Sequence, residues 1–508
     1  MLDDSQRLAL ETIDKGKQAI IFVPSRASAE KTAEEISKKS SLVSPELEKK
    51  VLQGVSIPTK QCRRLSHCVK KGIAFHHSGL TSKQKDLIEE SFKTGEIKII
   101  CATPTLAAGL SLPVFRVIIK SLKRYSGRWG MDWIPVLEYL QMAGRAGRPE
   151  YESYGEAITI AKSSADKENI YEKYVCGKPE EIYSKLAVEP VLRTYLLSLI
   201  SSGIIRDDKT MKEFFGKTFW AQQFQDYQKL ESIMDKMLSL LSEWNFITVD
   251  GNSQDDFVSA GNLNGERKMR ATVIGKRVSE LYLDPLTANH LLSCLANFNE
   301  EKKPFSLLQM ISNTLEMRPL LRIKSKQSEF IQEELMKNYE LLLHKEPSAF
   351  DIEYNEFMNS IKTALFFDAW INENDEDFLL EKFDIRPGEI RFKQETADWL
   401  LYAAEELSQI KQYKEAIKEI KKLRIRVKHG VKEEILGLLK LKGIGRIRAR
   451  RLYLNGIKDL GDLKRMDLSS LSQILGKKLA EEVKIQLGQE IKEIPKGTRK
   501  GQLSLQKF

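Results

Sequence analysis

Two arginines in the first third of the chain have a spacing suited to binding the phosphates of a nucleotide. The stretch LQMAGRAGRP at residues 140–149 places Arg145 and Arg148 three residues apart, behind Gln141 and beside two glycines. Arginines at i and i+3 lie on one face of a helix, and adjacent glycines let a phosphate chain approach the backbone. An isolated pair more often caps a helix or pairs with nearby glutamates, so the spacing alone leaves both interpretations open.

The loop that usually surrounds nucleotide phosphates, G-x-x-x-x-G-K-[ST], does not occur in the sequence. The nearest match, MKEFFGKTFW, has the final Gly216, Lys217 and Thr218, but Met211 stands where the first glycine belongs. The acidic run NENDEDF at 372–378 follows no buried strand and is typical of a solvated turn rather than a magnesium site. The sequence therefore predicts only part of a nucleotide site.

Composition limits the class of protein. At 508 residues the chain is long enough for three to five domains, and 42% of its residues are hydrophobic. No apolar run reaches membrane-spanning length and the N-terminus lacks the pattern of a signal peptide, so we expect a cytoplasmic protein. The closest cysteines, in CRRLSHC, place Cys62 and Cys68 near His67, but no second ligand pair follows at zinc-site spacing. We expect free thiols, a surface histidine and no metal centre.

The net charge of +10 is unevenly distributed. Residues 411–508 contain 26 Lys and Arg against 11 Asp and Glu, a net +15, whereas the first 410 residues carry a net −5. A basic segment of this kind is often only a solvated surface, but it coincides here with a phosphate-binding motif described below. We expect the C-terminal fifth to bind a polyanion.

Polar residues follow three predicted strands in the first 165 residues. QAIIFVPSR, GIAFHHSGL and IKIICATPTLAAGLSLPVFRVIIK each join an apolar run to a polar turn and a helical segment. This alternation predicts a parallel sheet with its functional groups at the carboxyl ends of the strands. The side chains expected there are those of Ser25, Arg26, His77, Ser78, Thr103 and Thr105.

These segments, in order, resemble the motifs of a known motor family. IIFVPSR, FHHSGL, ATPTLAAGLSLP and QMAGRAGRP are similar to successive motifs of the second RecA-like domain in superfamily two helicases. The last two resemble the Ski-two-like group, and nearly the whole chain resembles its archaeal Hjm-type DNA helicases. The resemblance implies an ATP-dependent DNA helicase that moves 3′ to 5′ and serves replication fork restart and DNA repair.

The resemblance does not extend to the family's first RecA-like domain, which carries the phosphate loop and the Asp-Glu magnesium box. We expect that domain in cis before Met1 or as a separate chain, and no ATP hydrolysis without it. ATP and Mg²⁺ would be held mainly there. The resemblance then implies roles in this chain for Gly109, Gln141, Arg145 and Arg148, with both arginines stabilising charge at the γ-phosphate.

DNA contacts are also implied by the resemblance. Ser25, Arg26, His77, Thr103 and Thr105 would hold backbone phosphates of the tracking strand. The stretch KSLKRYSGRWGMDWIP at 120–135 predicts a β-hairpin, and in similar helicases a hairpin here separates the duplex. It would present Arg124, Tyr125 and Trp129 to DNA, although its aromatic residues could equally form a hairpin core.

The remainder of the chain predicts mainly helical domains, giving a multidomain fold that is α/β and then mainly α. Residues 166–280 combine helical stretches with a strand-like turn, which predicts a winged helix acting as a hinge, with Trp220 and Trp244 in its core. Residues 281–430 read as all helix. Pro387 and Gly388 give a helix start signal in IRPGEIRFKQETADWLLYAAEELSQI.

This last helix places Phe392, Glu395, Thr396 and Trp399 on one face. A Trp at such spacing is ordinarily a core residue, but the helix resembles the ratchet helix of the family, whose Trp stacks on a DNA base. Phe392 stands one heptad earlier, where relatives can place an arginine.

The basic C-terminal fifth contains two further motifs. In residues 431–490, LLKLKGIGRIRARRLY places Gly443 and Gly445 between helical stretches, a helix-hairpin-helix pattern that binds DNA phosphate through backbone N–H groups. Arg446 and Arg448 follow directly. The tail at 491–508 resembles the peptide that binds the sliding clamp (PCNA). Its anchors would be Gln502, Leu505 and Phe508.

Two other function classes stay open at this stage. One is a non-enzymatic DNA-binding adaptor tethered to a clamp. The other is an RNA helicase of the same group, which the helix-hairpin-helix disfavours because this motif more often serves DNA.

Overall fold

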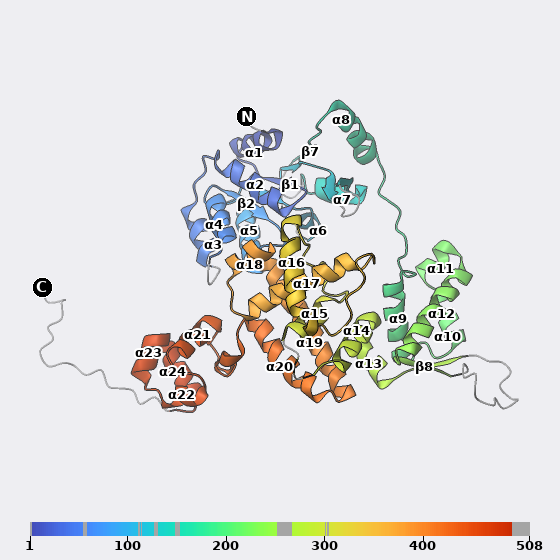
Figure 1. Ribbon diagram of the computed structural model, residues 1–508. Helices are drawn as coiled ribbons and strands as arrows, with labels where there is room; N and C mark the ends of the chain where they lie inside the picture. Colours follow the sequence, from blue (N-terminus) through green and yellow to red (C-terminus); the bar gives the residue numbers. More distant parts are fainter. Residues whose placement is uncertain are drawn as a thin grey trace, which may run out of the picture. The chain divides into compact units, whose positions relative to one another are not determined.

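The computed structural model describes residues 3–53, 58–109, 112, 114–125, 131–147, 153–250, 267–299, 301 and 304–489. They divide into two compact units (Figure 1). Unit 1 comprises residues up to 243 together with 247–270 and 376–393, and unit 2 comprises 244–246, 271–375 and the residues from 394 onward. Within the described residues, no helix has both the length and the apolar character needed to cross a membrane.

Unit 1 contains the predicted parallel sheet. Its five strands are hydrogen-bonded in the order β2-β3-β1-β4-β7, and every pair is parallel. Four of them are buried along their whole length, as expected for apolar strands covered on both faces. The strands are β1 Ala19–Phe22, β2 Ile73–His76, β3 Ile99–Ala102, β4 Arg116–Ile119 and β7 Glu156–Thr159.

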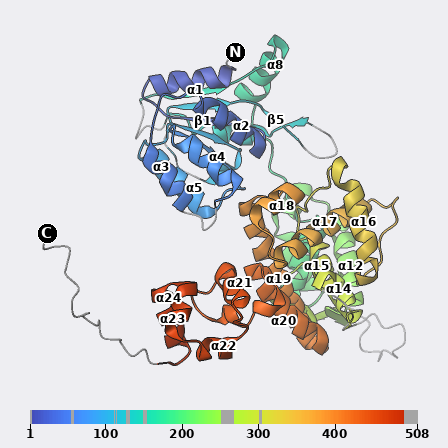
Figure 2. The same cartoon turned by 60° about the vertical axis from the view of Figure 1, so that its left-hand side comes forward.

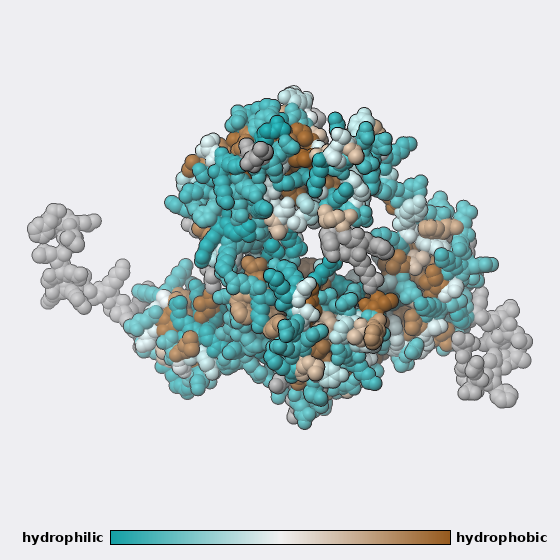
Figure 3. All heavy atoms as spheres, turned by 45° about the horizontal axis from the view of Figure 1, so that its top comes forward, coloured by the Kyte–Doolittle hydropathy of each residue, from teal (hydrophilic) through white to brown (hydrophobic). Residues whose placement is uncertain are grey.

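Helices flank this sheet and share its hydrophobic core (Figure 2). On the face of the molecule drawn in Figure 3, hydrophilic side chains predominate, as expected where helices turn their apolar sides toward a core. Cys62 and Cys68 are buried free thiols and the side chain of His67 is 75% exposed, which confirms the thiols and surface histidine expected from CRRLSHC. The helices are α1 Asp4–Asp14, α2 Arg26–Ser37, α3 Pro45–Gln53, α4 Lys60–Val69, α5 Ser82–Lys93, α6 Thr105–Gly109 and α7 Val136–Ala143.

The core of the sheet domain continues past residue 165. Helix α8, Ser164–Ile170, runs into a π-helical turn at Tyr171–Val175. Tyr174 in this turn is fully buried, and its hydroxyl donates to the Ile134 carbonyl at 2.6 Å. The ring of Tyr174 also packs against Tyr139 of α7, so this segment closes one side of the domain.

The next segment has the helices and small sheet typical of a winged helix. Trp220 is buried, as predicted, and the half-buried Trp244 packs edge-on against Phe246. The match to a phosphate loop is only a link between two helices, because Gly216 ends α10 and Thr218 caps α11. The elements are α9 Glu189–Ser201, α10 Asp208–Gly216, α11 Phe219–Phe224, α12 Tyr227–Glu243, β8 Ile247–Asp250 and β9 Lys268–Ala271.

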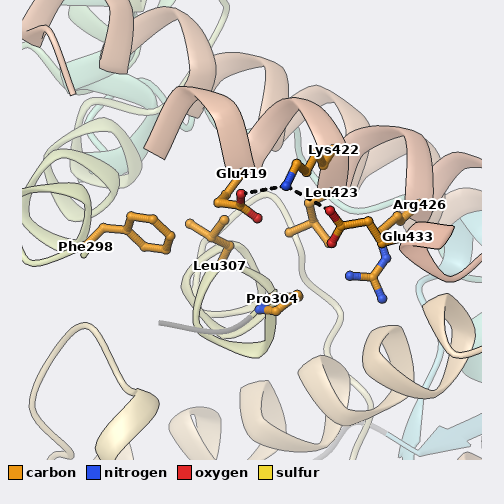
Figure 4. A pocket seen from close by; sticks show the side chains of 8 residues that line it. All are labelled: Phe298, Pro304, Leu307, Glu419, Lys422, Leu423, Arg426 and Glu433. Atoms are coloured by element: carbon orange, nitrogen blue, oxygen red, sulfur yellow. Dashed lines mark hydrogen bonds and ion pairs between the residues drawn. The ribbon is translucent and has the colours of Figure 1, made fainter. Parts of the chain in front are cut away.

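The segment predicted to be all helix, residues 281–430, is mainly helical. Lys422 on its last helix forms ion pairs with Glu419 at 3.0 Å and Glu433 at 2.8 Å beside a small cleft (Figure 4). The helices are α13 Val273–Glu280, α14 Pro285–Ala296, α15 Pro304–Ser312, α16 Ser328–Asn338, α17 Tyr354–Ile371, α18 Glu376–Phe383, α19 Pro387–Lys411 and α20 Lys414–His429, with 3₁₀ turns at Ser325–Gln327 and Tyr339–Leu341.

The C-terminal helices enclose a hydrophobic core of their own, which includes Leu438, Leu452, Leu471 and Val483. Figure 2 shows them as a small bundle. They form two successive helix-hairpin-helix units rather than the single one noted in the sequence. The elements are 3₁₀ turns at Glu433–Ile435 and Leu438–Lys440, then α21 Arg446–Leu454, α22 Leu460–Arg465, α23 Leu468–Leu475 and α24 Lys477–Gln486.

Candidate nucleotide and nucleic-acid site

A cleft lies where β1, β2 and β3 end. Because parallel strands end at one edge of the sheet, the polar turns that follow them meet there, as the sequence predicted. The cleft also takes residues from the β-hairpin and from α7. The polar side chains that line it include those of Ser25, Arg26, Ser78, Thr103, Thr105, Arg124 and Gln141.

Hydroxyl groups and a helix terminus make one part of this cleft suited to a phosphate. Ser25 is exposed and caps α2, its hydroxyl accepting a hydrogen bond from the Ser28 N–H at 3.2 Å. The hydroxyls of Thr103 and Thr105 lie 2.9 Å apart. The N-terminus of a helix attracts anions and hydroxyls can donate to them, so these groups fit a sugar-phosphate backbone.

The two arginines of the cleft are ion-paired. Arg26 contacts the Glu389 carboxylate, and Arg124 donates to both carboxylate oxygens of Glu138 at 3.1 and 3.2 Å. The Arg124 side chain is 52% exposed. Ion pairs at such exposure contribute little stability, so exchange of the carboxylate for a phosphate is energetically accessible.

The prediction that His77 grips a phosphate is wrong. His77 is fully buried, with Nε2 3.2 Å from Glu30 Oε1 and with Nδ1 accepting from the Gly79 N–H at 3.1 Å. Burial opposes ionisation of Glu30, but the hydrogen bond to His77 and the charges of Arg386 and Arg64 lower its pKa to about 2. His77 therefore holds the loop after β2 in place instead of reaching a ligand.

The same loop is joined to the start of α19. The Gly388 N–H donates to the Gly79 carbonyl at 3.1 Å, and Arg386 Nε lies 3.2 Å from Glu30 Oε1. A Cβ on Gly388 would lie 2.4 Å from the Ser78 carbonyl oxygen, so glycine is required at this contact. Sequence reasoning missed Glu30 and Arg386, and treated Gly388 only as a helix start signal.

The QMAGRAGRP segment differs from the expected helix. Helix α7 ends at Ala143, so Arg145 lies in the turn beyond it and the prediction of two arginines on one helix face is wrong. The residues after this end pack closely: Gly147 has φ +67°, and a Cβ there would lie 2.5 Å from the Gly155 nitrogen. Its N–H donates to the Val114 carbonyl at 3.0 Å, so the segment runs beside the sheet.

Three of the predicted nucleotide residues can be placed. Gln141 is exposed in the last turn of α7, and Gly109 is the last residue of α6. The Arg145 guanidinium donates to the Ala107 carbonyl of α6, which fixes the turn after α7 against that helix. Arg148 lies outside the described residues.

The predicted hairpin is confirmed in its two strands. β5 Lys123–Tyr125 and β6 Met131–Trp133 pair antiparallel, while Trp129 and the turn lie outside the described residues. Trp133 is half-buried, with its ring 4.2 Å from the Lys123 ammonium and 6.0 Å from the Tyr174 ring. Trp133 therefore anchors the base of the hairpin in the core, while Arg124 on the opposite strand lines the cleft.

The four residues predicted to share one face of α19 differ in their exposure to solvent. Phe392 is 54% exposed and Glu395 is exposed, whereas Thr396 is buried. Trp399 is half-buried, and its indole N–H donates to the Leu281 carbonyl at 3.1 Å. The face of the Trp399 ring, rather than its N–H, is therefore the part suited to a base.

The first helix-hairpin-helix has the predicted backbone. Gly443 has φ +85° and Gly445 caps α21 in an extended conformation. Arg448 is exposed and donates to the Gly443 carbonyl at 2.8 Å. Arg446 instead is half-buried, with its guanidinium 4.6 Å from the centroid of the Trp370 ring.

Another arginine of the basic run is also used internally. Arg450 pairs with Glu373 at 2.6 Å and with Glu434 at 2.9 Å. Burial opposes ionisation of Glu373, but the hydrogen bond from Arg450 keeps its pKa below the usual value. The acidic run at 372–378 thus covers the turn after α17 and the first residues of α18, and one of its carboxylates fixes the hairpin instead of facing solvent.

The second hairpin was not predicted. Gly476 has φ +86° and separates α23 from α24, whose first residues are the exposed Lys477 and Lys478. The signal was present in ILGKKLAEEV, a glycine between two helical stretches followed by two lysines. In the part of the chain that the structure describes, no group of three or more His, Cys, Asp or Glu residues could hold a metal ion.

Comparisons with known families agree with this arrangement. Residues 3–150 match the helicase conserved C-terminal domain, residues 305–430 match archaeal helicase domain 4, and residues 435–489 match a SAM-like helix-hairpin-helix tandem. Fold and site together thus define a helicase motor domain joined to helical DNA-binding modules.

Similarity to individual proteins identifies the family of helicases more narrowly than the domain matches do. The ATP-dependent DNA helicase Hel308 of Pyrococcus horikoshii is 36% identical over 509 residues, which cover 98% of this chain and 68% of that protein. The Hel308 of Pyrococcus abyssi is also 36% identical, with the same coverage, and that of Methanocella arvoryzae is 36% identical with 66% of its length covered. The chain belongs to the Hel308 family of archaeal superfamily two helicases.

Proposed function

We propose that this chain is the motor and DNA-gripping part of an ATP-dependent DNA helicase that translocates 3′ to 5′ and unwinds DNA at replication forks. The observation that carries the proposal is the cleft at the carboxyl edge of the sheet, which gathers Ser25, Thr103 and Thr105 beside Gln141. The names of the Hel308 relatives support ATP and DNA as its ligands.

ATP would be shared with a second domain. The 508 residues contain no phosphate loop, so we propose that a first RecA-like domain, in cis or as a separate chain, holds most of the ATP and Mg²⁺. From this chain, Arg145 and Arg148 would stabilise charge developing on the γ-phosphate, with Gln141 and Gly109 beside it.

DNA would be held in three ways. Ser25, Arg26, Thr103 and Thr105 would contact backbone phosphates in the cleft, and Arg124, Tyr125 and Trp129 of the hairpin would meet the duplex junction. Phe392 and Trp399 would stack on bases of the single strand. Gly443, Gly445 and Arg448, together with the second hairpin at Gly476, would bind phosphates beyond the motor.

The tail gives a further partner to the proposal. Gln502, Leu505 and Phe508 lie outside the described residues, and we keep the sliding clamp (PCNA) as their proposed partner. A peptide of residues 491–508 should bind the clamp with a Kd on the order of micromolar, and Phe508→Ala should remove most of that affinity. Equal affinities of the two peptides would leave only a basic tail.

ATP hydrolysis tests the proposal. The chain alone should hydrolyse no ATP above background, and addition of the first RecA-like domain from the Pyrococcus horikoshii relative should produce hydrolysis stimulated by single-stranded DNA. Arg145→Ala should then reduce turnover at least about 10²-fold while DNA binding persists. Arg7→Ala, which removes only an exposed pair with Asp4, is the matched control.

The alternatives give different results. A DNA-binding adaptor would bind DNA but hydrolyse no ATP with the added domain. An RNA helicase would be stimulated by single-stranded RNA more than by DNA of the same sequence.

A further inference from the structure

A tyrosine occupies a backbone position that normally belongs to glycine. Tyr282 has φ +55°, in the left-handed region that side chains disfavour. Among the described residues, six other than glycine have a positive φ, and the remaining five are Gln, Asn, Glu or Asp. Tyr282 is thus the one aromatic residue in this conformation within the described chain.

The conformation of Tyr282 is imposed by the end of α13. The Tyr282 N–H donates to the Ser279 carbonyl at 3.0 Å, and the Leu283 N–H donates to the Val278 carbonyl at 3.3 Å. These two bonds form a Schellman motif with Tyr282 at its left-handed residue, and the buried Leu283 and Val278 supply the accompanying apolar contact. Glycine would satisfy the same two bonds without steric conflict.

The side chain of Tyr282 contributes almost nothing to the stability of the fold. It is 86% exposed, so it buries almost no apolar surface to offset its unfavourable backbone. A strained residue whose side chain does not support the core points to a role outside folding.

The turn that carries Tyr282 is bound to α19 at two points. The Trp399 indole N–H holds the Leu281 carbonyl, which is the peptide group directly before Tyr282. Arg277, one turn earlier on α13, donates to Tyr402 at 3.2 Å and to Glu406 at 2.8 Å. The backbone of Tyr282 is therefore held in place through α19, while its side chain remains exposed.

The carboxylates near the turn are already engaged. Glu280 and Glu406 pair with Arg277, and the Asp284 side chain caps α14 by accepting from the Leu286 N–H at 2.8 Å. An exposed aromatic side chain on a backbone fixed in this way offers a π-face, and the flat apolar face of a nucleic-acid base is the surface that stacks on it.

We propose that Tyr282 is a base-stacking residue for single-stranded DNA and that Trp399 is, in addition to any stacking of its own, the positioning residue that presents it. This inference rests on the proposed function, because it assumes that a single strand passes α19. It adds a contact from α13 that neither the motifs nor the family comparisons assign.

Substitution by glycine separates this role from a structural one. Tyr282→Gly relieves the backbone conflict, so the variant should melt at or above the temperature of the parent chain. It should nevertheless bind a fluorescein-labelled oligo-dT strand about tenfold more weakly, the usual effect of losing one stacked base. An oligonucleotide of equal length made of abasic sites should bind parent and variant equally.

Two further variants complete the test. Gln412→Gly is the matched control, because Gln412 has φ +63° and the same pair of hydrogen bonds at the end of α19, to Gln409 and from Tyr413 to Ser408. It should keep full affinity for oligo-dT. Tyr282→Phe keeps the ring and should bind within about twofold of the parent, since stacking needs no hydroxyl.

Each other outcome overturns the inference. A lower melting temperature for Tyr282→Gly would show that the tyrosine supports the fold. Unchanged affinity for oligo-dT would show that this surface does not meet the strand and would leave a protein partner to be sought. Equal losses on the two oligonucleotides would indicate a phosphate contact. If the parent chain bound neither oligonucleotide, the proposed function itself would fail.

Discussion

The two hairpins of the C-terminal tandem show that similar basic sequences can serve different purposes. In the first, Arg446 lies over Trp370 and Arg450 pairs with Glu373, so two of its cations fix the hairpin to neighbouring helices. In the second, Lys477 and Lys478 are both exposed. Two cations of the first hairpin are therefore used within the fold, whereas the two lysines of the second are accessible to a ligand.

The sheet domain repeats this distinction between internal and exposed groups. Ser25 follows β1 and His77 follows β2, and both were expected to reach DNA. His77 is fully buried against Glu30, whereas Ser25 is exposed in the cleft. The contacts that form around each strand end, rather than the residue type, decide which group can meet a ligand.

The largest effect on stability should follow replacement of Trp370, whose ring lies against the Arg446 guanidinium. Trp370 is 6% exposed, its indole donates to the Val427 carbonyl at 2.7 Å, and Gly430 packs against it. Trp370→Ala should lower the free energy of unfolding by about 3–5 kcal/mol, measured by denaturant titration. The control Phe350→Ala changes a residue that is 98% exposed and should stay within about 0.5 kcal/mol of the parent. Similar values for both variants would contradict an internal role for the first hairpin.

The next effect concerns acid stability. Glu30 has a pKa of about 2 in the folded chain against 4.5 in the unfolded chain, so its stabilisation is complete above pH 4.5 and is lost as the pH falls towards 2. The shift corresponds to about 3 kcal/mol. Glu30→Gln should remove that part of the stability at neutral pH and flatten the decline between pH 4.5 and 2. Unfolding curves across this range check it, with the exposed Asp4→Asn as control, and a parallel decline in both variants would refute it.

Trp399 combines an internal role with a proposed ligand contact. Its indole N–H binds the Leu281 carbonyl, and its ring is only half-buried. Trp399→Ala should weaken single-strand binding by about 1–3 kcal/mol, measured by fluorescence anisotropy. If the variant instead melts far below the parent and binds normally when folded, Trp399 is a core residue.

The smallest effect should come from the second hairpin. Replacing Lys477 and Lys478 by Ala should reduce the dependence of DNA affinity on salt by roughly one counterion for each DNA phosphate that the lysines no longer neutralise. Arg450→Ala should leave the salt dependence unchanged, since its charge is already paired with Glu373. Equal slopes for the two variants would remove the difference between the hairpins.

The sequence was sufficient for strands β1, β2 and β3, because short apolar runs such as AIIF at Ala19–Phe22 are long enough for a strand and too short for a helix. It also located the polar turns, since parallel strands end at one edge. It could not show that α7 stops at Ala143, because the contacts of the following turn, such as that of the Arg145 guanidinium with the Ala107 carbonyl, exist only once the chain has folded. The left-handed Tyr282 has no marker in the sequence for the same reason.

The burial of His77 was equally hidden. Its partners Glu30 and Arg386 lie 47 residues before it and 309 after it in the chain, and no local pattern links them. The second hairpin, by contrast, has a marker in the sequence, the glycine followed by two lysines in ILGKKLAEEV. It was not predicted because the first hairpin has the larger cluster of arginines.

Strand displacement tests the central claim most directly. With the first RecA-like domain of the Pyrococcus horikoshii relative added, the chain should unwind a duplex that carries a 3′ single-stranded tail, in the presence of ATP and Mg²⁺, and should leave a duplex with a 5′ tail intact. Displacement of the 5′-tailed duplex alone, or of neither duplex while ATP is hydrolysed, would contradict the proposed helicase.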